Sequence, residues 1–249
     1  MVATSPGLTQ VKTFLTQHGA GFMVNTQYVQ GSSCPRCMGI PKPGFQSCYP
    51  CEFEYPGVAS DRVGILAYGV SGHQSGAVMR AYKASNPGTT AVETVQFMLA
   101  YALVGHQACL ADPIHGAPTL WATVPSVPVR TGIHPLHVLA HRVLGSRMPM
   151  AGLSAAPTLS GPARSFTPGN YVASGVAGHH VLLVEDTWTT GAHVESAAAA
   201  LKYAGAKSVT TLVVARWMDP NRPNTWPFLV ANAQSPYDPD ICPITGAHC

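Results

Sequence analysis

Charge is scarce in this sequence. Only 10% of its 249 residues are Asp, Glu, Lys or Arg, and the formal net charge is +3. The basic residues form no block, so composition does not indicate a nucleic-acid-binding protein. Long apolar runs are also missing, since none approaches the ~18 residues of a membrane-spanning helix. The first residues lack the basic and then apolar pattern of a signal peptide. We therefore expect a cytoplasmic protein that does not enter a membrane.

Several catalytic motifs are absent as well. No GxSxG elbow is present, which disfavours a serine hydrolase. The glycine-rich stretch 69–76 is neither GxGxxG nor a phosphate-binding P-loop, and we expect a loop there. His137 and His141 have the spacing of a zinc-binding pair, but the glutamate of HExxH is missing between them. Ordinary core or surface histidines are therefore expected.

Apolar residues are plentiful by contrast. They make up 46% of the chain, which is enough to fill a core and excludes disorder of the whole chain. The 24 glycines and 22 prolines indicate many loops. Helix 89–110 has Thr89 or Thr90 as its expected cap. The spacing of apolar residues predicts helices at 89–110, 134–145 and 192–205, and strands at 62–70, 119–129, 180–186 and 208–217.

The order strand, helix, strand over residues 180–217 is a βαβ unit, which requires two parallel strands. We therefore expect an α/β core with a parallel sheet in residues 61–218. Residues 146–178 have little regular pattern apart from a short extended piece near 170–174, and they form a long excursion from this core. A cysteine-rich segment, 1–60, and a proline-rich tail, 219–249, are expected to flank it.

The stretch HHVLLVEDTWTTGAH, residues 179–193, carries the most chemistry. A strand that is apolar on both faces ends in two adjacent carboxylates, Glu185 and Asp186, where ligands bind in open α/β sheets. Threonines and a glycine then lead into a helix, whose N-terminus and backbone N–H groups attract anions. Carboxylates suited to sugar hydroxyls, beside a cradle for a phosphate, predict a site for a sugar phosphate.

Residues 34–51 hold two CxxC pairs, CPRC and CYPC, with ten residues between them. Two such pairs can supply four thiolates to one tetrahedral zinc ion; four free cysteines or a redox pair are the alternatives. A complete shell of four thiolates has no open position, so this zinc would fold the segment rather than catalyse. The four residues are Cys34, Cys37, Cys48 and Cys51.

The remaining cysteines do not indicate a disulfide framework, because the total of seven is odd and no secretion signal is seen. Cys109 is expected to pack inside an apolar helix. Three alternatives stay open for Cys242, His248 and Cys249: part of a second metal site, a replacement ligand in the first, or no metal.

VLLVEDTWTTG resembles the motif by which type I phosphoribosyltransferases bind 5-phosphoribosyl 1-pyrophosphate (PRPP): four apolar residues, two acidic ones, two variable ones and TTG. The resemblance implies that Glu185 and Asp186 hold the ribose 2′ and 3′ hydroxyls. It implies that the following loop binds the 5′-phosphate through Thr187, Trp188, Thr189, Thr190, Gly191 and Ala192. The first acid is Glu where Asp is common, and Trp188 and His193 are unusual.

The resemblance extends to the ComF-like branch of that family. The double CxxC, the pair Tyr82–Lys83, the strand end TVPSVP and the stretch RTGIHPLHVLA are similar to that branch, although Ile133 and His134 replace its usual Phe and Asn. It implies that Ser126 and Arg130 face the pyrophosphate, with Arg130 catalytic, and that the excursion 146–178 is a hood. Lys83 is either solvated with Tyr82 or meets a phosphate, and Arg164 is a candidate hood contact.

Two functions follow from this resemblance. The first is a phosphoribosyltransferase that passes ribose 5-phosphate from PRPP, with Mg²⁺, to a small-molecule acceptor, a nitrogen nucleophile, and releases pyrophosphate. The second is an accessory protein that binds PRPP or a nucleotide without turnover, since ComF-like members are associated with DNA uptake in natural competence. The acceptor is not readable from the sequence, and a homodimer stays open.

Overall fold

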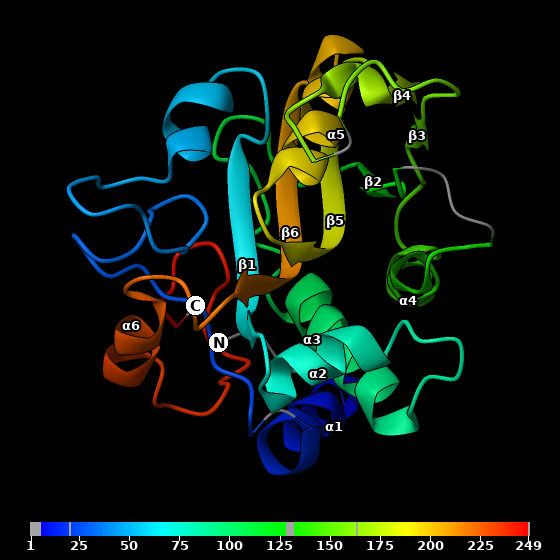
Figure 1. Cartoon of the computed structure of the whole chain (residues 1–249). Coiled ribbons are helices and arrows are strands. Elements are labelled where there is room, and N and C mark those ends of the chain that lie inside the picture. The colour runs from blue at the N-terminus through cyan, green and yellow to red at the C-terminus, as the bar shows by residue number, and fades with distance from the viewer. Residues whose placement is uncertain (1–5, 20, 128–131, 163, 249) are drawn as a thin grey trace.

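The computed structural model describes residues 6–19, 21–127, 132–162 and 164–248, and its centre is a four-stranded sheet (Figure 1). The order across the sheet is β1-β6-β5-β2, and all three neighbouring pairs are parallel. The strands are β1 (Arg62–Val70), β2 (Leu120–Thr123), β5 (His180–Trp188) and β6 (Ser208–Met218). The predicted α/β class with a parallel sheet is confirmed.

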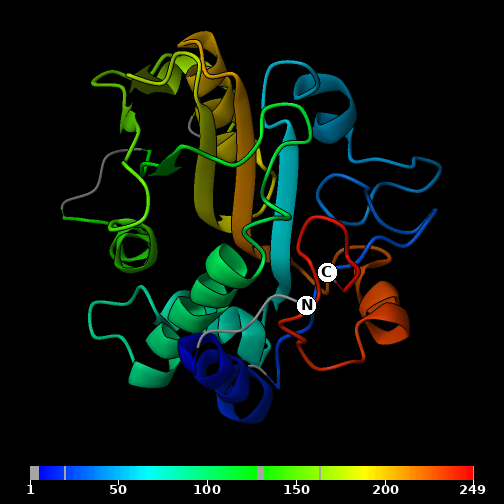
Figure 2. The same ribbon diagram turned by 180° about the vertical axis from the view of Figure 1, so that it is seen from behind.

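Helices cover both faces of this sheet, as a parallel sheet requires. Helix α5 (Ala192–Tyr203), which joins β5 to β6, packs on one face. Helices α3 (Thr89–Gly105) and α4 (Pro135–Leu144) pack on the other, as the view from behind shows (Figure 2). The sheet is therefore buried between two helical layers, and its strand ends are the places where a ligand can reach it.

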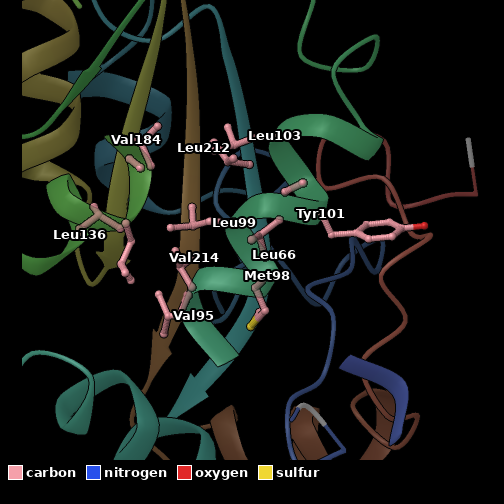
Figure 3. Packing of buried hydrophobic residues seen from close by; sticks show 14 of the residues in the cluster. Leu66, Val95, Met98, Leu99, Tyr101, Leu103, Leu136, Val184, Leu212 and Val214 are labelled. Carbon is pink, nitrogen blue, oxygen red and sulfur yellow. The ribbon is translucent and has the colours of Figure 1, made fainter. Parts of the chain in front are cut away.

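Alternation along the strands divides the core into two halves. Leu182 and Val184 of β5 belong to the half of the core that faces α3. Figure 3 shows Val184 in this half with Leu99 of α3 and with Leu212 and Val214 of β6. Val181 and Leu183 face α5 instead. Each half is built of buried apolar side chains, mostly aliphatic with some aromatic ones, whose removal from water drives the packing of the layers.

Several predicted elements have different bounds in the structure. The extended segment expected at 119–129 is a strand only as far as Thr123, and Pro125, which has no N–H for a ladder hydrogen bond, follows closely. Helix α3 ends at Gly105 rather than 110, and its N-cap is Gly88 rather than Thr89 or Thr90. Strand β5 continues past Asp186 to Trp188, so both acidic residues lie within the strand.

The expected loop at 69–76 is wrong in its second half, because helix α2 (Gln74–Ala81) begins there. Gly76 explains why a glycine-rich stretch can form a helix at this point. A Cβ at Gly76 would collide with the carbonyl of Val70, so the glycine lets α2 pack directly against the end of β1. The same close approach brings Arg80 and Lys83, which lie in and just after α2, toward the end of β5.

The excursion 146–178 contains a small antiparallel hairpin, β3 (Gly152–Ala155) with β4 (Tyr171–Ser174). The extended piece expected near 170–174 is β4, whereas sequence periodicity missed its partner. Just before β4, in a short 3-10 turn (Pro168–Asn170), buried Asn170 ties the excursion together. Its Oδ1 accepts from the Ser160 amide at 2.8 Å, and its Nδ2 donates to the Gly161 carbonyl.

The flanking segments contain further helices that were not predicted. Helix α1 (Pro6–Phe14) packs on α3, with the rings of Phe14 and Phe97 4.7 Å apart, and α6 (Thr225–Asn232) lies in the tail. Short π-helical turns occur at Leu15–Gly19 and Pro50–Glu54. None of the helices in the described ranges is long and apolar enough to cross a bilayer.

Candidate functional site

The carboxyl end of β5 opens into a cavity of about 550 Å³. Because β5 remains extended through Glu185 and Asp186, their side chains leave the strand in opposite directions. Asp186 continues the row that faces α3, and Glu185 continues the row that faces α5. Both residues nevertheless line the cavity, since the strand ends at its wall.

Asp186 is held by three neighbours. Its Oδ2 accepts hydrogen bonds from the Tyr82 hydroxyl at 2.7 Å and from Lys83 Nζ at 2.6 Å, and His134 Nε2 lies 3.8 Å away. Burial acts to raise the pKa of Asp186, but the Lys83 ammonium and the Tyr82 hydroxyl outweigh it and lower the pKa to about 2. Asp186 is therefore a fixed negative charge at neutral pH.

Glu185 has the opposite electrostatic setting. Burial, and then repulsion from the neighbouring Asp186 carboxylate, raise its pKa well above the usual range. The Glu185 carboxyl also accepts a hydrogen bond from the Asp186 amide at 2.8 Å. One carboxyl of the pair is thus stabilised as an anion and the other is biased toward the protonated form.

The carbonyls of the loop from β5 to α5 accept hydrogen bonds from side chains on the inner side of the loop. Arg216 Nη1 donates to the carbonyls of Trp188 at 2.8 Å and Thr189 at 2.7 Å, and the Tyr55 hydroxyl donates to the Thr190 carbonyl at 3.0 Å. In a trans peptide the N–H points away from the carbonyl. The amides of the three residues after these carbonyls, 189 to 191, consequently point away from Arg216 and Tyr55.

Gly191 makes this loop sterically feasible. It has φ of +93°, a left-handed conformation that glycine adopts without strain, and it is the N-cap of α5. A Cβ at Gly191 would overlap the ring of Trp188. Trp188 itself is buried beneath the loop, so its side chain supports the loop from below.

Four basic side chains surround the same cavity. Arg80 and Lys83 come from the α2 region, Arg164 from the excursion 146–178 and Arg222 from the tail. Arg80 stacks over the Trp217 ring, with its guanidinium carbon 4.8 Å from the ring centroid. These cations and the N-terminus of α5 give the cavity a positive field, which favours a ligand with several negative charges.

Ser126 lies in a second cavity of about 610 Å³, between the end of β2, the start of α4 and strand β3 of the excursion 146–178. Lys83 lines both cavities, so they adjoin at its side chain. His137 also lines this second cavity. Burial, and then repulsion from His141, lower the pKa of His137, which favours a neutral ring. The Thr123 hydroxyl lies 2.9 Å from His137 Nδ1.

Most of the residues that the sequence singled out meet at these two cavities, while Arg130 lies outside the described residues. Tyr82 is buried, so a solvated Tyr82–Lys83 pair is wrong. Sequence reasoning missed Arg80 and Arg222, because lone arginines outside any motif carry no signal. The first cavity brings together Lys83, Arg164, Glu185, Asp186, Thr187, Thr189, Thr190, Gly191 and Ala192.

The two CxxC pairs converge, as predicted. The four sulfurs lie within 4.8 Å of one another, and the sulfurs of Cys37 and Cys48 are 3.7 Å apart. A tetrahedral zinc with bonds of about 2.3 Å needs sulfurs about 3.8 Å apart, so this donor set fits zinc. The cluster comprises Cys34, Cys37, Cys48 and Cys51.

The segment that holds this cluster also supports the candidate site. Tyr55 bonds to the loop carbonyl of Thr190, and Arg36 donates to the buried Glu195 of α5 at 2.6 and 2.9 Å. The Ser60 amide donates to the other Glu195 oxygen at 2.9 Å. The first turn of α5 and the loop before it are therefore anchored to the cysteine segment.

Comparison with solved structures finds partial similarity to phosphoribosyltransferases. Orotate phosphoribosyltransferase of Mycobacterium tuberculosis H37Rv, in complex with PRPP, is 16% identical with a TM-score of 0.33, over 57% of this chain and 76% of that one. Purine phosphoribosyltransferase from Pyrococcus horikoshii Ot3 is 18% identical with a TM-score of 0.32, over 53% and 88%. No family model matches the chain. No curated protein matches it either.

Proposed function

We propose that this chain is a ComF-like phosphoribosyltransferase that binds PRPP in the cavity at the end of β5. The proposal rests on one arrangement. The loop before α5 has its carbonyls hydrogen-bonded to Arg216 and Tyr55, and it leads into the N-terminus of α5. The same cavity is lined by the carboxyl pair and by four basic side chains. Backbone N–H groups and a helix N-terminus suit the 5′-phosphate, and carboxyls suit ribose hydroxyls. Few ligands other than a phosphorylated sugar need both.

The second cavity supports a transfer reaction. It adjoins the first at Lys83 and is large enough for a small acceptor or for the pyrophosphate. In the proposed reaction the bond from the anomeric carbon to pyrophosphate breaks and a bond to an acceptor nitrogen forms. The nitrogen then loses its proton, and pyrophosphate leaves.

This chain's residues act on that reaction by position and charge. Thr189 to Gly191 hold the 5′-phosphate, and Asp186, kept anionic by Lys83, stabilises positive charge that develops on the ribose. Lys83 and Arg164 neutralise the negative charge of the departing pyrophosphate. Mg²⁺ bound with PRPP supplies further neutralisation of the phosphate oxygens.

A second candidate is binding of PRPP without turnover, and one feature favours it. The described residues that line the second cavity include no carboxylate, so His134 and His137 are the side chains there that could act as a general base. A cavity without a carboxylate to take the proton of the acceptor is compatible with an accessory protein. Release of pyrophosphate distinguishes the two candidates.

Calorimetric titration with PRPP and Mg²⁺ tests both. We expect the wild-type chain to bind, and Asp186→Asn to lose about 10- to 100-fold in affinity, because a charged hydrogen bond contributes about 1.5–3 kcal/mol. The matched control is Glu52→Gln, which removes an exposed carboxylate from the cysteine segment. Equal affinity of Asp186→Asn and wild type would refute the assigned site.

Pyrophosphate release is then measured with a panel of nitrogenous bases as acceptors. Release with one acceptor establishes the transferase. Tight PRPP binding without release for every acceptor favours the accessory role.

A further inference from the structure

A second group of metal-donor side chains lies away from the candidate site. The last turn after α3 and the C-terminal tail bring His106, Cys109 and Cys242 together, with their donor atoms within 4.8 Å of one another. His106 and Cys242 are 4% and 0% exposed, and Cys109 is half-buried. More than 130 residues separate Cys109 from Cys242 in the chain, so folding rather than local sequence assembles this group.

The hydrogen bonding of His106 suits a metal ligand. Its Nε2 lies 2.7 Å from the carbonyl of Pro239. A carbonyl can only accept, so Nε2 carries the proton and Nδ1 of the neutral ring keeps the lone pair that a metal ion takes. Metal-binding histidines usually donate their other ring N–H to a carbonyl or carboxylate in this way.

The turn that holds Cys242 is also preorganised. The Cys242 amide donates to the Ala247 carbonyl and its own carbonyl accepts from Gly246, both at 2.8 Å. On the α3 side, the Cys109 amide donates to the His106 carbonyl at 2.9 Å, which fixes the two donors three residues apart.

We propose that His106, Cys109 and Cys242 bind a zinc ion that joins the C-terminal end of α3 to the tail. Two thiolates and a neutral imidazole are donors that zinc prefers among the divalent ions. On binding, the two thiols lose their protons to solvent and no oxidation occurs. His248, an alternative ligand in the sequence, instead faces Asp238 at 3.8 Å, and Cys249 lies outside the described residues.

The position of the site indicates what it does. In the described residues, the regular backbone pairing of the tail after α6 is an isolated β-bridge between Ile241 and His248. It is also held by Tyr237 and Ile244, which pack in the core beside α3, and by polar contacts such as those of Tyr101 and Lys12 with Asp240. A zinc ion would close a long loop and fix this tail against the core.

Zinc content of the purified full chain tests the proposal. We expect two zinc ions per chain for the wild type, one for each cluster, and one for Cys242→Ser and for Cys109→Ser. His248→Ala is the matched control, since it removes a tail donor outside the cluster, and it should retain both ions. One zinc in the wild type with no loss in Cys242→Ser overturns the proposal.

Two further readouts use the wild-type chain and do not depend on whether the variants fold. Thiol counting in denaturant should find every cysteine reduced; a disulfide between Cys109 and Cys242 would overturn the zinc assignment. Crystals of the zinc-loaded protein should show an anomalous peak between the sulfurs of Cys109 and Cys242. Absence of that peak, with the peak at the Cys34 cluster present, would also overturn it.

Discussion

Adjacent carboxyl groups at the end of β5 have different protonation tendencies because their neighbours differ. Asp186 meets an ammonium and a phenol, whereas Glu185 meets burial and a negative neighbour. The energy for this arrangement comes from the rest of the fold, as is common at binding sites. A ligand hydroxyl, or a cation bound with the ligand, would reduce the repulsion between the two carboxyl groups.

Replacing Glu185 by Gln should therefore stabilise the ligand-free protein as pH rises. The pKa of Glu185 is raised in the folded state, so its contribution to stability is complete below the unfolded value near 4.3 and is lost as pH climbs through the folded value. Gln has no such loss. The difference in unfolding free energy should grow by up to about 1.4 kcal/mol per pH unit within that window.

Chemical denaturation at several pH values measures this difference. The exposed Glu52→Gln change serves as control and should show no pH-dependent gap. A gap that shrinks on going from pH 4 to pH 8 would contradict the assigned environment of Glu185.

Gly191 provides a second test at the residue scale. Gly191→Ala places a side chain at φ of +93° and drives a Cβ into the Trp188 ring. Left-handed backbone alone costs about 1–2 kcal/mol for a non-glycine residue. Gly175→Ala, at φ of +68° with open space around it, incurs only that backbone cost. We expect Gly191→Ala to be the less stable variant in thermal unfolding and to lose PRPP binding; equal stability and retained binding would show that the loop is not constrained as described.

At the scale of elements, α5 is fixed by an ion pair that reaches it from the cysteine segment. Glu195 is fully buried, and Arg36 is its cationic partner. Removing one member of a buried pair leaves an uncompensated charge, so Arg36→Ala should cost about 3–5 kcal/mol of unfolding free energy.

The matched control for Arg36→Ala is Lys202→Ala, which breaks the more exposed pair with Asp61. That change should cost about 1 kcal/mol or less. Denaturant unfolding measures both losses. If the Arg36 variant lost no more than the Lys202 variant, Glu195 would not depend on its partner.

The elements that the sequence predicted best are those with strong apolar periodicity. β1, β5, β6 and α5 are continuous apolar or alanine-rich segments, and their order alone implied the parallel pairing. Helix α2 was missed because glycine lowers helix propensity, and only tertiary contact with Val70 explains Gly76. The short hood hairpin has too few apolar residues to show a period.

The candidate site was predictable where one contiguous motif supplied it. Residues 185–191 and the CxxC pairs could be recognised in the sequence from the spacing of their residues. Arg80 and Arg222 reach the cavity from separate parts of the chain, and the direction of Glu185 depends on β5 continuing to Trp188. Neither feature is encoded by any local pattern.

At the scale of the whole molecule, the segment that holds the Cys34 cluster is linked to the candidate site by the hydrogen bonds of Tyr55 and Arg36. If the Cys34 cluster holds zinc, removing that ion should release the cysteine segment and with it the hydrogen bond from Tyr55 to Thr190. Loss of one such bond, about 1 kcal/mol, corresponds to a roughly fivefold loss of PRPP affinity, and unfolding of the segment adds to it.

A zinc-selective chelator that leaves Mg²⁺ in solution allows this to be measured by titration with PRPP. Tyr55→Phe separates the two effects, because it removes the hydrogen bond while the cluster keeps its metal. Affinity should fall on zinc removal and recover when zinc is returned. Unchanged affinity in zinc-free protein would show that the cluster and the loop are independent.

The most direct measurement of the account is a crystal structure of the protein soaked with PRPP and Mg²⁺. We expect the 5′-phosphate against the backbone amides of residues 189–191 and the ribose hydroxyls against the carboxyls of Glu185 and Asp186. Phosphate density at another surface, with this cavity filled only by solvent at saturating PRPP, would contradict it.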